Sequence, residues 1–393
     1  MNITVIGGGA SGMLAALTAS ENPENRVILL ERQSRAGRKL SASGNGRCNI
    51  TNTNPFSGRY HGEDPSFSSF ALAAFPPSDS LKYFESLGLV CCEQYGGRVY
   101  PFSDSSNSVV DALRFALDAS GVELCCGEAA KSIAFSKDKG FHIFTDNRVF
   151  PADRVIVACG GRAGGKLGGV SDGYELLKSL GHSCTKLYPA LVPLVTEGDF
   201  TRSLKGVRAQ VSLRLGSLSS SGELQFTENG ISGPAVFDIS RKASVEGGTV
   251  EINLLPGLES IYPLLLKRRS SCPSLEAGSL LTGILHNRLS LVMVKHCGIR
   301  PSQPIGSLSD GQLREVAESC CRLTLRVKGT GSFDNAQITA GGIRTSEFKR
   351  ETLESLLVPG LYACGEVLDV DADCGGFNLR WAWASGRLAG MLK

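Results

Sequence analysis

The 393-residue sequence lacks any apolar run approaching the roughly 20 residues that a membrane-spanning helix requires. It also lacks an excess of charge of one sign, because charged residues make up 20% of the chain and the formal net charge is +3. The basic residues are scattered, so we expect no nucleic-acid partner. No leader precedes the first apolar segment, Ile3–Ile6, which argues against a signal or transit peptide. These absences predict a cytoplasmic protein without a membrane partner.

The spacings typical of metal centres and redox dithiols are also missing. The 13 cysteines include no Cys-x-x-Cys pair, and the five histidines show neither a catalytic triad nor a metal-ligand spacing. The acidic run Asp369, Asp371 and Asp373 lacks the terminal glutamate of a calcium loop. We therefore expect no metal and mostly reduced, buried cysteines, and the sequence identifies no catalytic acid or base.

What the sequence does contain is a dinucleotide-binding pattern at its N-terminus. The apolar run Ile3–Ile6 leads into a Gly-x-Gly-x-x-Gly turn at residues 7–12, and an Ala-rich helical stretch follows. A second apolar run, Val27–Leu30, ends at Glu31, 19 positions after the last glycine. This order of strand, glycine turn, helix and acidic residue predicts a βαβ unit that binds a dinucleotide.

Each part of this pattern has a mechanical reason. Gly7 permits the tight turn, Gly9 lets the backbone approach a pyrophosphate, and Gly12 lets the helix pack closely on its strand. The helix N-terminus offers N–H groups and a partial positive charge to the phosphates, and Glu31 accepts hydrogen bonds from a ribose. The predicted binding residues in this segment are Gly7, Gly9, Ala10, Ser11, Gly12 and Glu31.

A polar, glycine-rich loop over residues 37–49 follows the predicted ribose-binding acid. It carries three glycines and three cations and has little to bury. Placed directly after Glu31, it can wrap the phosphates and reach the reactive ring of a cofactor, with its cations neutralising phosphate charge. The candidate residues here are Arg32, Arg38, Lys39, Asn45, Gly46, Arg47, Cys48 and Asn49.

Two later segments repeat the combination of a buried strand and a glycine turn, Arg154–Gly161 and Gly360–Glu366. The second lies near the C-terminus, where Gly375–Asn378 opens a final helix. A chain that returns in this way to its first sheet favours FAD, which is longer than a nicotinamide dinucleotide, and no second Gly-x-Gly-x-x-Gly opens a nicotinamide domain. NAD(P)H is then expected only as a transient co-substrate. Further candidates are Ala130, Cys159, Gly160, Gly161, Gly365, Glu366, Gly376, Phe377, Asn378 and Leu379.

The middle of the chain has a different texture. Before it, helices are expected near residues 79–87 and 108–119, and a hairpin is expected at Asp138–Gly140. From about residue 190, Val- and Leu-rich strands predominate. Leu-rich helical stretches follow over 262–266, 280–294 and 310–317, and a strand is expected over 322–328. We predict an α/β protein with a Rossmann-like FAD-binding domain over 1–187 and 336–393. The segment 188–335 is expected to be an insertion.

Longer motifs carry a family resemblance. The glycine turn with Glu31 and Gly37 resembles the start of the glutathione-reductase-type FAD fold. Over the whole chain the sequence resembles the BaiN-like flavoproteins, also described as aminoacetone-oxidase-like NAD(P)/FAD-dependent oxidoreductases. The motifs that carry this resemblance are Gly44–Asn52, Gly96–Pro101, Gly230–Ala235, Thr339–Gly342 and Gly365–Asp371. The resemblance implies that the inserted region combines a β-rich part with a small helical cap.

The chain departs from the family pattern near its C-terminus. Where the family has Gly-Pro-Thr-Gly-Gly-Tyr-Asn-Leu-Gln, residues 372–380 read Ala-Asp-Cys-Gly-Gly-Phe-Asn-Leu-Arg, so a tyrosine becomes Phe377 and Arg380 adds a charge. The expected function is that of an FAD-dependent oxidoreductase acting on a small molecule. Three alternatives stay open: an NAD(P)H-linked reductase of an activated double bond, an oxygen-using oxidase of a small amine such as aminoacetone, and a flavin-holding binding or modifying protein. The oligomeric state is left unassigned.

Overall fold

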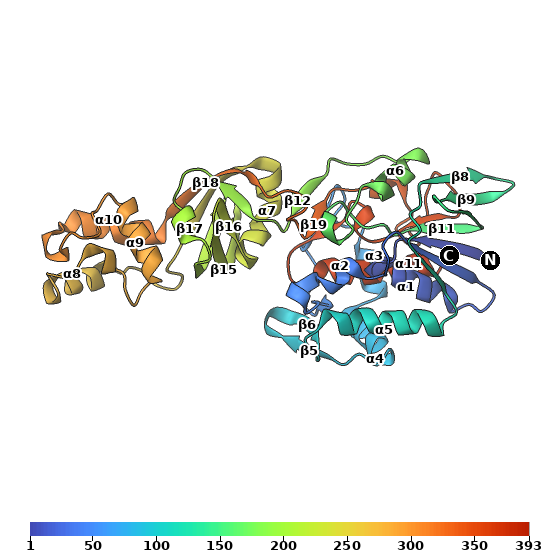
Figure 1. The fold of residues 1–393 in the computed structure, drawn as a ribbon, viewed down its shortest axis with the longest axis horizontal. Coiled ribbons are helices and arrows are strands. Elements are labelled where there is room, and N and C mark those ends of the chain that lie inside the picture. Colours follow the sequence, from blue (N-terminus) through green and yellow to red (C-terminus); the bar gives the residue numbers. More distant parts are fainter. Residues whose placement is uncertain (393) are drawn as a thin grey trace. The chain divides into compact units, whose positions relative to one another are not determined.

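The computed structural model describes Met1–Leu392 and divides the chain into two compact units (Figure 1). Unit 1 combines Met1–Tyr188 with the C-terminal segment that begins at Gln337, and unit 2 comprises Pro189–Ala336. Each unit has its own buried apolar core. Among the described residues, no helix has the length and apolar character needed to cross a membrane.

Unit 1 is built on a five-stranded parallel sheet. Its strands, in spatial order, are β20 (Leu361–Ala363), β11 (Arg154–Val157), β1 (Asn2–Ile6), β2 (Arg26–Glu31) and β7 (Glu123–Cys126). The central strands are apolar along their length because both faces are covered, and Val5, Leu29 and Val155 are fully buried. The N-terminal and C-terminal segments of the chain therefore share one sheet, which confirms the expected Rossmann-like fold.

Two helices from opposite ends of the sequence pack against each other in unit 1. They are α1 (Ala10–Ser20) and α11 (Phe377–Gly390), and Figure 1 shows the red C-terminal helix among the blue N-terminal elements. Their backbones approach closely: a Cβ on Gly386 would lie 2.3 Å from the carbonyl oxygen of Ser11, and one on Gly390 would lie 2.5 Å from that of Ala15. Small residues at these positions fix the C-terminal helix on the predicted dinucleotide-binding helix.

Smaller elements surround this sheet and confirm most of the expected local structure. The helices are α2 (Arg38–Ser41), α3 (Ser69–Ala74), α4 (Pro77–Ser86), α5 (Ser106–Ala119) and α6 (Asp172–Ser179). The strands form a β3-β6-β5 sheet (Thr51–Asn52, Arg98–Pro101, Cys91–Gln94), a β10-β9-β8 sheet (Val149–Ala152, Gly140–Phe144, Ser132–Ser136), and the pairs β21-β4 (Asp371–Ala372, Tyr60–His61) and β12-β19 (Tyr188–Ala190, Ile338–Ala340). The β8-β9 connection is the expected hairpin at Asp138–Gly140.

Unit 2 contains a closed antiparallel barrel. Its strands, in spatial order, are β13 (Leu194–Thr196), β16 (Gly230–Ser232), β15 (Leu218–Thr227), β14 (Arg208–Leu215), β17 (Gly248–Asn253) and β18 (Leu323–Thr330). The helices of this unit are α7 (Pro234–Glu246), α8 (Tyr262–Ser271), α9 (Asn287–His296) and α10 (Asp310–Cys321). Along β14, Val211, Leu213 and Leu215 are buried in alternation with more exposed neighbours, as a barrel strand requires.

Unit 2 also shows where the sequence pattern misleads. The helix expected over 280–294 begins only at Asn287, because Gly283 adopts a left-handed φ of +82° and the His286 ring accepts a hydrogen bond from the Arg288 amide as an N-cap. The helix α7 was not expected at all. It begins at Pro234, inside the Gly230–Ala235 motif and directly after Gly233, and proline is favoured in the first turn of a helix.

Candidate functional site

The glycine turn after β1 is fixed by packing at two of its three glycines. The Gly7 amide donates to the Leu30 carbonyl at 2.8 Å, which joins the turn to the end of β2. A Cβ on Gly7 would lie 2.5 Å from the Ala158 oxygen, and one on Gly12 would lie 1.8 Å from the Gly7 oxygen. These distances exclude any side chain, so Gly7 and Gly12 bring the ends of β1 and β11 into contact with the helix α1.

A second group of predicted glycines faces open space instead. A Cβ on Gly9, Gly46 or Gly160 would meet no atom within 4 Å. Gly9 is also the N-cap of α1, which has neither a capping side chain nor an acidic residue in its first turn. The helix N-terminus is therefore free of an internal anion at the point where its dipole and N–H groups favour one. This combination fits the pyrophosphate of a dinucleotide.

Glu31 connects the turn to the loop that follows β2. One carboxylate oxygen accepts from the Gly8 amide at 2.8 Å and the other accepts from the Gln33 amide at 2.7 Å. Burial raises the pKa of Glu31 above its ordinary 4.5, and these two amides oppose that rise. The predicted ribose-binding carboxylate is thus held in a fixed position at the carboxyl end of β2.

Lys39 and Glu366 join three segments that are distant in sequence. The Lys39 ammonium lies 2.8 Å from one oxygen of the Glu366 carboxylate, and the other oxygen accepts from the Thr339 amide at 2.8 Å. Gly161 allows this arrangement, because a Cβ there would lie 2.4 Å from the Glu366 oxygen. The predicted residues Lys39, Gly161 and Glu366 therefore form one cluster, in which the lysine charge is already paired.

The predicted arginines also have protein partners. Arg32 pairs with Asp172 at 3.0 Å, and the Arg38 guanidinium donates to the neutral Gln33 amide oxygen at 2.7 Å. The Arg47 guanidinium contacts Asp104 at 2.5 Å and lies 4.1 Å from the centre of the Tyr100 ring. Two of the three guanidinium groups are thus paired with carboxylates, whereas Arg38 is bonded only to a neutral amide.

At the C-terminal end of the site, Gly376 brings α11 against the loop before β3. Gly376 is the left-handed N-cap of the helix, with φ +101°, and a Cβ there would lie 2.6 Å from the Thr51 carbonyl and 2.7 Å from the Asn49 amide oxygen. That Asn49 oxygen is buried and has no hydrogen-bond partner among the described residues. An unsatisfied buried acceptor is costly, so Asn49 is well suited to receive a donor from a bound cofactor.

The remaining predicted residues at this end have mainly packing roles. The Asn378 side chain accepts from the Ala372 amide at 2.9 Å and donates to the Ala372 carbonyl at 2.8 Å, so it shapes the turn before the helix. Phe377 is buried edge-on against the Tyr60 ring. Leu379 packs on the core, as does Ala130, which is buried.

Arg380, the added charge in the C-terminal motif, is buried as well. Its guanidinium donates to the carbonyl oxygens of Asn52 and Asn54, at 3.3 and 3.2 Å, and burial lowers its pKa. The two residues that depart from the family pattern, Phe377 and Arg380, therefore both make buried contacts with neighbouring segments, next to the double glycine of the motif.

The structure also contains polar clusters that the sequence did not predict. The His182 ring lies between Glu347, at 2.9 Å from Nδ1, and the Ser355 hydroxyl, at 3.0 Å from Nε2. Ser355 is buried, and its oxygen also accepts from the Leu357 and Val358 amides at 3.0 and 2.9 Å. The hydroxyl therefore donates its proton to His182, and both side chains are buried, so the arrangement links three segments of the chain as a buried clamp. No spacing in the sequence could have indicated it, since the three residues come from separate loops.

Cys48 and Cys159, both predicted site residues, are not poised as thiolates. Burial raises the pKa of each thiol to about 12. Cys48 is also one of the few non-glycine residues with a positive φ, +58°, and Asn45 is another, with +57°. The Gly44–Asn49 loop is therefore held in a strained conformation that presents backbone groups, not reactive sulfur.

Comparison with known proteins agrees with this geometry. The family described as "HI0933-like protein Rossmann domain" matches residues 1–392. A 3-dehydro-bile acid delta(4,6)-reductase from Clostridium scindens is 40% identical over 401 residues, covering 99% of this chain and 98% of the relative. A ribosomal RNA dihydrouridine synthase from Escherichia coli is 30% identical over 386 residues, covering 97% and 95%. The open conformation of a flavocytochrome c3 fumarate reductase matches with a TM-score of 0.50 and 16% identity, over 100% of this chain and 77% of that chain.

The fold, together with the groove at the Gly7–Gly12 turn (the glycine groove), thus defines a Rossmann-type flavoprotein. The chain belongs to the HI0933-like family, and the expected resemblance to BaiN-like proteins is confirmed. It is an FAD-dependent oxidoreductase, as the sequence predicted. The residues present fit FAD: open glycines at the helix N-terminus, a fixed acceptor in Glu31, and an orphaned buried acceptor in Asn49.

The position of Glu31 leads to a pH-dependent prediction. Ribose hydroxyl donors stabilise the ionised carboxylate, so the pKa of Glu31 is lower with FAD than without it. FAD then binds with full affinity at pH values above the pKa that Glu31 has without FAD, which is raised above 4.5. Binding weakens as the pH falls through that pKa. For Glu31→Gln we expect about tenfold weaker FAD binding at neutral pH, the scale of a charged hydrogen bond, with a much flatter pH profile. Quenching of FAD fluorescence between pH 4.5 and 7.5 measures both, and identical profiles for the two proteins would contradict this role.

Proposed function

We propose that this protein uses a nicotinamide nucleotide to reduce an activated carbon–carbon double bond in a steroid-like small molecule. The observation that carries the proposal is the 40% identity, over 99% of the chain, to a protein named for reduction of a 3-dehydro-bile acid. A 3-keto group conjugated with an alkene makes the alkene electrophilic, so it can accept a hydride at its far carbon and a proton at the carbon next to the carbonyl. FAD, when bound, supplies the two-electron chemistry that links the two substrates.

The chain's own residues contribute positioning. The open N-terminus of α1 binds the pyrophosphate of the cofactor and Glu31 binds its ribose, while the Lys39–Glu366 pair connects the loop after β2 to the C-terminal segment. The N-terminus of α11, whose N-cap is Gly376, lies next to Asn49. The dipole at a helix N-terminus stabilises negative charge that develops nearby during reduction.

The proposal is tested by following the product. Purified protein with FAD, NADPH or NADH, and a 3-keto-4-ene steroid is incubated without oxygen, and the steroid is analysed by mass spectrometry. We expect a product heavier by two hydrogen atoms, formed in proportion to the nicotinamide nucleotide oxidised. Peroxide release from aminoacetone in air, with no steroid reduction, would instead identify the amine-oxidase alternative. Absence of both reactions with a flavin that resists reduction would favour a flavin-holding protein.

A second candidate function is the reduction of uridine in RNA. Two relatives, from Escherichia coli and Haemophilus influenzae, are named ribosomal RNA dihydrouridine synthases and match 97% of this chain at 30% and 28% identity. The uracil C5=C6 bond is conjugated with a carbonyl, so the reaction belongs to the same chemical class. The net charge of only +3 favours the small molecule over RNA, because RNA binding depends on neutralising phosphates. Formation of dihydrouridine in ribosomal RNA, and no steroid product, would reverse this order.

A further inference from the structure

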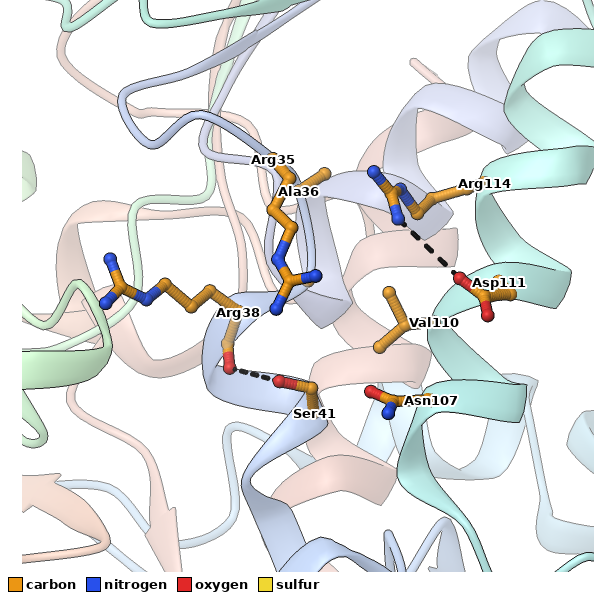
Figure 2. Close-up of a pocket in the computed structure, with 9 residues that line it drawn as sticks. Arg35, Ala36, Arg38, Ser41, Asn107, Val110, Asp111 and Arg114 are labelled. Carbon is orange, nitrogen blue, oxygen red and sulfur yellow. Dashed lines mark hydrogen bonds and ion pairs between the residues drawn. The ribbon is translucent and has the colours of Figure 1, made fainter.

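A small cationic cavity lies between the loop after β2 and the helix α5. It has a volume of about 150 Å³ and is shown in Figure 2. We call it the arginine pocket, and it is lined by Arg35, Ala36, Gly37, Arg38, Ser41, Asn107, Val110, Asp111 and Arg114. Figure 2 shows the Arg35 guanidinium at this space and the Arg114 guanidinium beside Asp111, whereas the Arg38 guanidinium points away from it. Two guanidinium groups and one carboxylate leave an excess of positive charge here.

Neither of these two guanidinium groups has a close ion pair. Arg35 has no hydrogen bond or ion pair among the described residues. Arg114 lies 3.6 Å from Asp111, one helical turn away, which is a loose contact. Exposed arginines elsewhere in unit 1 have closer carboxylate partners, such as Arg350 with Asp64 at 3.0 Å. The arginine pocket therefore carries positive charge that no close carboxylate of the described residues neutralises.

The walls of the pocket are rigid. Gly37 packs on Val110 so closely that a Cβ would lie 2.7 Å from the valine methyl carbon, and the Ser106 hydroxyl donates to the Ser41 carbonyl. The Gly37 amide donates to the Gly8 carbonyl at 2.8 Å, which fixes the loop to the glycine turn. On α5, Asn107, Val110, Asp111 and Arg114 follow the spacing of a single helix face. The two walls thus bring the Arg35 and Arg114 guanidinium groups to one space (Figure 2).

From these observations we infer that the arginine pocket binds a phosphomonoester dianion. A planar guanidinium recognises phosphate oxygens through paired charged hydrogen bonds, and the Asn107 amide adds a further donor. A cavity of about 150 Å³ admits a phosphate group with its attached oxygens but not an entire nucleotide. Binding here is separate from the pyrophosphate groove, which lies at the open glycines of α1.

The same chemistry can come from the 2′-phosphate of NADPH or from free inorganic phosphate. If the nucleotide is the source, the pocket selects NADPH over NADH, and that part of the inference rests on the proposed function. Binding of inorganic phosphate does not rest on it. Binding of a phosphomonoester should weaken as the pH falls through its second pKa of about 6, because the monoanion carries less charge.

The test compares ligand binding to the FAD-loaded protein by isothermal titration calorimetry. The ligands are inorganic phosphate, NADP⁺ and NAD⁺, and the variants are Arg35→Gln and Arg114→Gln. Arg26→Gln is the matched control, since Arg26 is an exposed arginine of the same unit that pairs with Glu123. We expect each pocket variant to weaken phosphate or NADP⁺ binding about tenfold, as loss of a charged hydrogen bond does, with NAD⁺ binding and FAD content unchanged.

The possible results separate the two sources and the two proposals. Preference for NADP⁺ over NAD⁺ that both pocket variants abolish identifies the nucleotide as the source. Phosphate binding that these variants weaken, without any NADP⁺ preference, identifies free phosphate. The inference is overturned if neither ligand binds, if Arg26→Gln has the same effect, or if only an RNA oligomer responds to the variants. Steroid reduction with either nicotinamide nucleotide can succeed in each case, so failure here is distinguishable from failure of the proposed function.

Discussion

Replacing Gly12 with alanine is expected to abolish FAD binding and to destabilise unit 1 by about 3 kcal/mol or more, the upper range for overpacked positions. The reason is steric: the new Cβ would lie 1.8 Å from the Gly7 carbonyl oxygen, so either α1 or the glycine turn must move. Both belong to the predicted pyrophosphate site. Thermal unfolding and the ratio of flavin to protein absorbance measure the two effects.

Gly9→Ala is the matched control for this prediction. A Cβ at Gly9 would meet no protein atom within 4 Å, so the variant should fold with the stability of the FAD-free protein. It should nevertheless retain less FAD, because the methyl group enters the space that fits the pyrophosphate. A Gly12→Ala protein with normal stability would contradict the packing role of Gly12. A Gly9→Ala protein with normal FAD content would contradict the proposed contact of Gly9 with the pyrophosphate.

The second prediction with a large expected effect concerns unit 1, which two separate segments of the chain form. A chain that ends at Tyr188 should fail to fold and to hold FAD, because it lacks the edge strand β20 and the helix α11 that packs on α1. A chain in which a short Gly-Ser linker joins Tyr188 directly to Gln337 should fold and bind FAD. The linker can be short because β12, which begins at Tyr188, pairs with β19, which begins at Ile338.

Circular dichroism and flavin content of the two shortened chains give the outcome. A flavin-loaded protein that ends at Tyr188 would show that the C-terminal segment is not needed for the cofactor. A linked chain that folds but binds no FAD would show that unit 2 contributes to the cofactor site. Either result would contradict the proposal that unit 1 alone forms the FAD-binding domain.

The fold and the cofactor were accessible from the sequence because short-range patterns determine them. The spacing from the Gly7–Gly12 turn to Glu31 predicts a βαβ unit, and the glycine turn after Ala363 indicates that the chain returns to the first sheet. Both patterns depend on backbone geometry that only a few residue types allow. The return of the chain to its first sheet favoured FAD, and the family motifs implied the same cofactor.

Side-chain partners were not accessible, because they depend on contacts between distant segments. Lys39, predicted to neutralise phosphate charge, pairs with Glu366 across most of the chain length, and Arg47, a predicted cofactor contact, contacts Asp104. The Asn378 side chain, another predicted cofactor contact, bonds to the Ala372 backbone, and no sequence pattern indicated this partner. The His182 clamp and the arginine pocket each combine residues from separate loops or helices, and no periodicity marks such clusters.

The central proposal is that this flavoprotein passes a hydride from a nicotinamide nucleotide to a conjugated double bond. The most direct measurement follows the visible absorbance band of the oxidised flavin in an oxygen-free stopped-flow experiment. We predict that NADPH or NADH bleaches this band and that a 3-keto-4-ene steroid, added without oxygen, restores it with formation of the saturated product. A flavin that no nicotinamide nucleotide reduces, or that only oxygen reoxidises, would contradict the claim.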